Sequence, residues 1–96
     1  MKEVYSEKYI EQIFTREVKK LGGLALKFVS PGVAGVPDRI VLLRNEKIAF
    51  VELKAPGKKM GPLQLKRKQQ LEALGFKVYC IDSLKGIEDF VKGVTG

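Results

Sequence analysis

The sequence contains no histidine and no tryptophan, and its only cysteine is Cys80. Without histidine, the protein cannot use a histidine-ligated zinc site, a Ser-His-Asp triad or a histidine general base. A lone cysteine cannot form an internal disulfide, which predicts a reducing compartment. Because Cys80 lies in the apolar segment 78–81, we expect its thiol to be buried as a small hydrophobic side chain.

Long apolar segments and acidic residues are also scarce. No apolar run approaches the roughly 20 residues that cross a bilayer, and the N-terminus lacks the apolar core of a secretion signal, so we expect a cytoplasmic protein. Basic residues outnumber acidic ones by 18 to 11; the net charge of +7 favours a polyanionic partner. A chain of 96 residues has room for one hydrophobic core, so residues 1–96 are expected to form a single domain.

Apolar residues at helical or alternating spacing, separated by breaks rich in glycine and proline, define the expected elements. They predict helices over residues 7–21, 62–74 and 84–91 and strands over 24–29, 38–43, 48–54 and 76–81. Ser6 is a suitable N-cap for the first helix, and Gly22 and Gly23 end it. The order α-β-β-β-α-β-α predicts an α/β domain in which a mixed four-stranded sheet is flanked by helices.

Charged residues interrupt the strand predicted over 48–54. Strand alternation places Ile48, Phe50, Glu52 and Lys54 on one face, while the other face is apolar throughout. The first four residues are apolar on both faces, which is typical of a strand covered on both sides. A carboxylate and an ammonium group at the end of such a strand are costly unless they are paired or bind a metal. This local violation marks the candidate functional site.

The two strands 38–43 and 48–54 are expected to form a hairpin. A three-residue loop, 44–46, would place Ile40 opposite Phe50 and Asp38 opposite Glu52, with both carboxylates on one side of the sheet. A two-residue turn would shift the register by one residue and separate the carboxylates. We predict the three-residue loop.

Two carboxylates with no histidine or thiolate nearby favour a hard divalent cation, Mg²⁺ or Mn²⁺. Such an ion would relieve the repulsion between Asp38 and Glu52 and lower the pKa of a bound water. Lys54 could orient that water or stabilise developing negative charge. In the alternative interpretation, Asp38 only forms a turn after Pro37 and Glu52 pairs with Lys54 at a sheet edge. The occurrence of both features in apolar strands of a basic protein favours the metal site.

Pro37-Asp38 followed by Glu52-Leu53-Lys54 resembles the PD-(D/E)XK nuclease signature, whose core is the restriction-endonuclease-like fold. A wider set of motifs resembles its VRR-NUC (virus-type replication-repair nuclease) branch, in the stand-alone form common in phages and prophages. These motifs are Gly22-Gly23-Leu24-Ala25-Leu26-Lys27, Ser30-Pro31-Gly32, Gly35-Val36-Pro37-Asp38-Arg39, Glu52-Leu53-Lys54-Ala55-Pro56-Gly57 and Pro62-Leu63-Gln64.

The resemblance implies a role for each matching residue. Asp38 and Glu52 would be metal ligands together with the backbone carbonyl of Leu53, Lys54 would be the catalytic lysine, and Gln64 would be an active-site glutamine. The family also has a first-helix glutamate in the metal site, and the spacing to Gly22-Gly23 implies Glu11. The helical wheel by itself does not choose among Glu7, Glu11 and Glu17, which all lie near the apolar stripe.

Basic residues cluster directly after the candidate site, and others lie nearer the first strands. The expected phosphate-binding residues are Lys58, Lys59, Lys66, Arg67 and Lys68, with Lys27 and Arg39 as weaker candidates. The alternative for the cluster is a solvated loop and helix face.

The sequence therefore predicts a Mg²⁺- or Mn²⁺-dependent DNA endonuclease, encoded by a phage or prophage. The resemblance implies a 5′-phosphate product and a homodimer that cleaves branched DNA such as four-way junctions. A non-catalytic nucleic-acid-binding module and a protein-binding accessory factor are the alternatives. The nucleic-acid-binding module predicts DNA binding that is unaffected by EDTA. The accessory factor predicts no salt-dependent DNA affinity.

Overall fold

The structure is a computed structural model that describes residues 6–96, so residues 1–5 of the predicted domain lie outside the description. The order of elements is the predicted one. The helices are α1 (Glu7–Lys20), α2 (Pro62–Ala73) and α3 (Leu84–Thr95), and the strands are β1 (Leu24–Lys27), β2 (Arg39–Leu43), β3 (Lys47–Leu53) and β4 (Lys77–Ile81). None of the helices within residues 6–96 has the length and apolar character that a membrane span requires.

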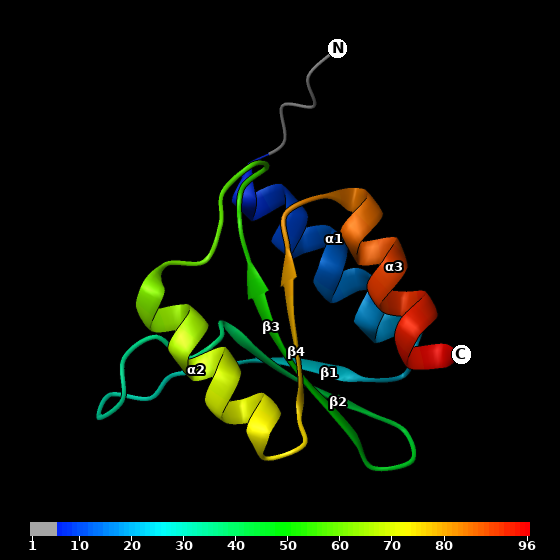
Figure 1. Cartoon of the computed structure of the whole chain (residues 1–96). Helices are drawn as coiled ribbons and strands as arrows, with labels where there is room; N and C mark the ends of the chain where they lie inside the picture. Colours follow the sequence, from blue (N-terminus) through cyan, green and yellow to red (C-terminus); the bar gives the residue numbers. More distant parts are fainter. Residues whose placement is uncertain (1–5) are drawn as a thin grey trace.

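The strands form one sheet in the order β1-β2-β3-β4. The pairs β1–β2 and β2–β3 are antiparallel, whereas β4 runs parallel to β3 because α2 crosses over between them. Helices α1 and α3 lie side by side on one face of the sheet, and α2 lies on the other (Figure 1). The mixed four-stranded sheet flanked by helices is confirmed.

The hairpin register is also as predicted. Ile40 lies opposite Phe50, and Leu43 lies opposite Lys47, which leaves residues 44–46 as the connecting loop. In this loop both Asn45 and Glu46 adopt the left-handed conformation, each with φ 62°. The register places the residue before β2 next to the end of β3, where the site is expected.

Two element boundaries differ from the prediction by more than one residue. Strand β1 ends at Lys27 rather than at residue 29; the register would place Pro37, which has no N–H for the ladder, opposite Val29. Helix α3 continues to Thr95 rather than ending at residue 91. Its extra turn is stabilised by Val94, which packs on the core together with Val91.

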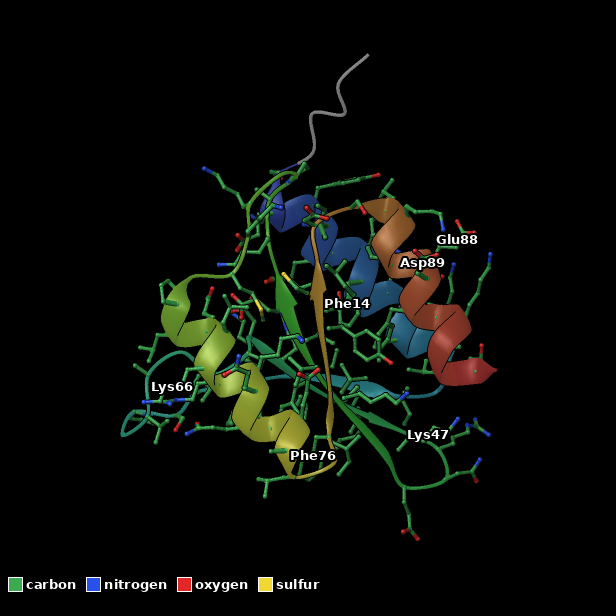
Figure 2. All side chains as sticks on the ribbon, viewed as in Figure 1. Phe14, Lys47, Lys66, Phe76, Glu88 and Asp89 are labelled. Atoms are coloured by element: carbon green, nitrogen blue, oxygen red, sulfur yellow. The ribbon has the colours of Figure 1, made fainter. Side chains whose placement is uncertain are left out.

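The hydrophobic core lies between the sheet and the pair α1–α3. Ile10, Phe14 and Val18 form the buried stripe of α1, and the rings of Phe14 and Phe90 pack at a centroid distance of 5.2 Å (Figure 2 labels Phe14). The other face is covered more thinly, since no residue of α2, which is described over its whole length, is buried.

Substitution of Phe14 by alanine is expected to lower the free energy of unfolding by about 3–5 kcal/mol, because a fully buried ring leaves a cavity. Leu74→Ala is the matched control: Leu74 is 74% exposed, and its loss should change stability by no more than about 0.5 kcal/mol. Urea denaturation of both variants measures the difference. Equal stabilities would contradict the placement of the core.

Candidate active site

Two carboxylates meet where β2 begins and β3 ends. Glu52 is the penultimate residue of β3 and is only 2% exposed. Asp38 directly precedes β2, is exposed, and accepts a hydrogen bond through Oδ2 from the backbone N–H of Leu53 at 2.9 Å. The carbonyl of Asp38 also accepts from the N–H of Phe28 at 2.8 Å. Asp38 is therefore fixed to the strands on both sides of it.

The two oxygens of Glu52 have different surroundings. Oε2 accepts from Gln64 Nε2 at 2.6 Å and lies 3.3 Å from Lys54 Nζ. Oε1 is buried and has no hydrogen-bond partner among the described residues. Burial, and next the charge of Asp38, raise the pKa of Glu52, while the bond to Lys54 opposes them. A buried oxygen without a partner is costly in a folded protein, so Oε1 is available to a ligand.

Lys54 and Gln64 complete the immediate surroundings of Glu52. The Lys54 side chain is 20% exposed, and its backbone N–H donates to the Ile81 carbonyl, which extends the parallel ladder past the end of β3. Gln64 lies in the first turn of α2, which starts at Pro62. Its Oε1 accepts from the N–H of Gly61 at 3.0 Å. The Gln64 amide is thus held at both ends, one of them on Glu52.

Glu11 does not contact Glu52. Its Oε1 lies 3.2 Å from Nη2 of Arg39, and Nη1 of Arg39 donates to the Ala25 carbonyl at 3.1 Å. A pocket of about 250 Å³ is lined by both Glu11 and Asp38. Within residues 6–96, no three histidine, cysteine, aspartate or glutamate side chains are grouped closely enough to hold a metal. The role of Glu11 as a ligand stays a prediction.

The predicted phosphate-binding residues divide into two groups. Lys27, Lys58, Lys59 and Lys66 are exposed, and Lys68 forms an ion pair with Glu72 at 3.1 Å. Lys66 points outward from α2, and the acidic Glu88 and Asp89 lie on α3, on the other side of the molecule (Figure 2).

The two predicted arginines are instead engaged with the protein. Arg39 is 8% exposed and is occupied by its contacts with Ala25 and Glu11. Arg67 donates through Nε to the Ala34 carbonyl at 2.8 Å and through Nη1 to Gln70. The structure does not present Arg39 for phosphate binding, because its guanidinium is buried against α1 and β1.

The prediction of a buried thiol is wrong, because Cys80 is exposed. It lies on β4 opposite Glu52, and β4 is the edge strand of the sheet. Partial desolvation, and next the charge of Glu52, raise the pKa of Cys80. Cys80 instead lines a groove of about 390 Å³ whose other walls are Lys58, Lys59, Met60, Leu65, Lys68 and Asp82.

The apolar part of this groove is not predicted by the sequence. Met60 and Leu65 come from the loop before α2 and from α2 itself. Neither position carries a motif that separates it from an ordinary loop or helix residue. The groove arises only because α2 folds back over the end of β4.

Comparison with known proteins supports the family and the fold. A solved structure described as a VRR_NUC domain superimposes with a TM-score of 0.80 at 29% sequence identity, over 92% of this chain and 97% of that one. The curated protein "Putative nuclease p44" of Acyrthosiphon pisum secondary endosymbiont phage 1 is 56% identical over 77 residues, which is 80% of this chain and 83% of that protein. No family model matches the chain.

The fold and the Asp38–Glu52–Lys54 arrangement place the protein in the PD-(D/E)XK nuclease class. Within that class, the chain belongs to the VRR-NUC family.

Proposed function

We propose that the protein is a Mg²⁺- or Mn²⁺-dependent DNA endonuclease. The observation that carries the proposal is the buried Glu52 carboxylate, whose Oε1 lacks a partner within residues 6–96 although Asp38 and Lys54 lie beside it. A carboxylate in this state is stabilised by a cation and destabilised without one. The membership of the VRR-NUC family supports the same function.

The residues present fit a hard divalent cation. Asp38, Glu52 and the backbone carbonyl of Leu53 would hold it, with Glu11 as a further candidate, and all four donors are oxygens. When bound, the ion supplies Lewis-acid polarisation of the phosphodiester and a more acidic water.

The neighbouring side chains have separate tasks in this proposal. Lys54 places a positive charge beside Glu52 and stabilises the negative charge that develops on the phosphate oxygens during hydrolysis. Gln64 fixes the orientation of Glu52 through the 2.6 Å bond to Oε2, and Oε1 would hold the cation. Asp38 is prealigned by its bond to the Leu53 N–H.

The substrate is proposed to be DNA, recognised by its backbone and shape. The exposed lysines around the site, Lys58, Lys59 and Lys66, carry no base-reading arrangement and suit phosphates. One compact site cuts one strand, so cleavage of both strands at a branch would use a homodimer. Four-way junctions are the branched substrate that we propose.

The decisive experiment is cleavage of duplex, nicked, flap and four-way-junction DNA with Mn²⁺, with Mg²⁺ and with EDTA. We expect cleavage with either metal, none with EDTA, and the highest rate on the junction. Binding of DNA that is unaffected by EDTA and never followed by cleavage would instead identify a non-catalytic nucleic-acid-binding module.

For the double variant Lys58→Gln/Lys59→Gln, we expect the slope of log Kd against log salt concentration to be smaller by about two than in the wild type. The reason is that two phosphate contacts are lost. The control is Lys85→Gln/Lys92→Gln, which removes the same charge from α3, where these lysines pair with Asp89 and Glu88. Fluorescence anisotropy at several salt concentrations measures both slopes. Identical slopes for the two variants would exclude Lys58 and Lys59 as phosphate contacts.

A further inference from the structure

The start of α2 packs on the segment that connects β1 to β2 (residues 28–38). In this segment Gly35 has φ +83°, and a Cβ built on it would lie 2.8 Å from Leu63 Cγ and 2.9 Å from the Leu63 carbonyl oxygen. Both distances are far below van der Waals contact. The Gly35 backbone therefore lies directly against Leu63, in a conformation and a space that only glycine fits.

A second contact lies one helical turn further along α2. Arg67 Nε donates to the carbonyl of Ala34 at 2.8 Å, while Arg67 Nη1 donates to Gln70 Oε1 at 3.1 Å. Residues four apart in a helix lie on the same side of it, so Leu63 and Arg67 face the segment together. We call Ala34 and Gly35, together with their contacts to Arg67 and Leu63, the α2 anchor.

The α2 anchor matters because the core holds α2 weakly. None of the residues of α2, all of which are described, is buried, whereas α1 and α3 each bury part of an apolar stripe. The residue after Leu63 is Gln64, whose amide donates to the buried carboxylate of Glu52. A small shift of the first turn of α2 would therefore also move the carboxylate of Glu52.

We propose that Gly35 and Arg67 are positioning residues that set the place of Gln64 and, through it, the orientation of Glu52. The inference rests on the proposed nuclease function. The segment that carries the α2 anchor also leads into Asp38, three residues after Gly35. The α2 anchor thus links Asp38 to Glu52 through α2, by contacts that belong neither to the strand pairing nor to the hydrophobic core.

The first test compares Gly35→Ala with Gly75→Ala. Gly75 has a similar left-handed conformation, φ +96°, but no atom of the described part of the chain lies within 4 Å of the added methyl group. Both variants carry the same kind of backbone strain, and only Gly35→Ala displaces Leu63. We expect kcat for Mn²⁺-dependent junction cleavage to fall about 10- to 100-fold in Gly35→Ala with KM nearly unchanged, and to stay at the wild-type value in Gly75→Ala. Equal kcat values in the two variants would overturn the inference.

The second test separates positioning from phosphate binding and does not depend on the folding of Gly35→Ala. Arg67→Gln is compared with Lys66→Gln, which removes the same charge from the next residue. We expect Arg67→Gln to lower kcat about tenfold and to leave the salt dependence of DNA affinity unchanged. Lys66→Gln, at a proposed phosphate contact, should lower that salt dependence by about one. An Arg67→Gln protein that lowers the salt dependence in the same way and keeps the wild-type kcat would make Arg67 a phosphate contact and overturn its positioning role.

The two proposals fail in different ways. A wild-type protein that cleaves no DNA with either metal would overturn both the nuclease function and the role of the α2 anchor in it. An active wild type whose Gly35→Ala and Arg67→Gln variants are equally active would overturn the α2 anchor alone. Circular dichroism of each variant confirms that the fold is retained before kcat is compared.

Discussion

Replacement of Lys54 by methionine should lower kcat for Mn²⁺-dependent DNA cleavage by about 10²- to 10³-fold, the usual cost of losing one preorganised charge at a reacting phosphate. Lys54 Nζ lies 3.3 Å from Glu52 Oε2 and its side chain is 20% exposed, so its charge acts where water is scarce. Methionine retains most of the side-chain volume and removes only the ammonium group.

The control for this prediction is Lys92→Met. Lys92 is a surface lysine on α3 that pairs with Glu88 at 3.0 Å, and the ion pair is exposed. Its removal changes the net charge by the same amount and should leave kcat unchanged. Single-turnover cleavage with the protein in excess measures the chemical step in both variants. A Lys54→Met protein that cleaves at the wild-type rate would remove Lys54 from the catalytic group.

Replacement of Glu52 by glutamine should abolish the stabilisation of the protein by Mn²⁺ and lower cleavage by more than about 10²-fold. Loss of a residue that only supports a metal ligand already costs about 10- to 100-fold, and Glu52 is proposed as a ligand itself. For the wild type, a metal concentration ten times Kd should raise the free energy of unfolding by about 1.4 kcal/mol. That corresponds to an increase in Tm of about 6–10 °C for a domain of this size.

Metal-free protein provides the matching measurement for Glu52→Gln. Burial raises the pKa of Glu52, which means that the folded protein disfavours the charged carboxylate. Without metal, the neutral glutamine should therefore be tolerated with little loss of stability. Glu88→Gln, on the surface of α3, is the control and should keep the full Mn²⁺ shift. An unaltered Mn²⁺ shift in Glu52→Gln would place the cation elsewhere.

The sequence was sufficient to predict the hairpin because several local requirements agree there. Alternating apolar residues specify strands 38–43 and 48–54, and the three residues between them allow the observed register. A shift by one residue would have turned the apolar residues to the wrong faces. The same agreement of pattern and caps holds for α1, where Ser6 accepts from the Tyr9 N–H as an N-cap.

The predictions about single side chains at the margins of the sheet were less successful. Cys80 lies in an apolar segment, yet it is exposed, because β4 is the edge strand and Cys80 faces a groove between the strand and α2. Arg39 is a basic residue of the kind that binds phosphate, yet its guanidinium is buried in contact with Glu11 and the Ala25 carbonyl. Whether a polar or small side chain is exposed depends on which element covers it, and the local sequence pattern does not contain that information.

The order of the elements, the hairpin register and the approach of the two acidic residues at its open end can be predicted from the amino-acid sequence, because they follow from alternation, turn length and backbone caps. Three other features are visible only in the folded protein: Oε1 of Glu52 has no partner within residues 6–96, Gln64 bonds to Oε2, and Arg67 holds the segment before β2. These features depend on where α2 packs after a loop of several residues. Packing over that distance is set by contacts between segments that are remote in the chain.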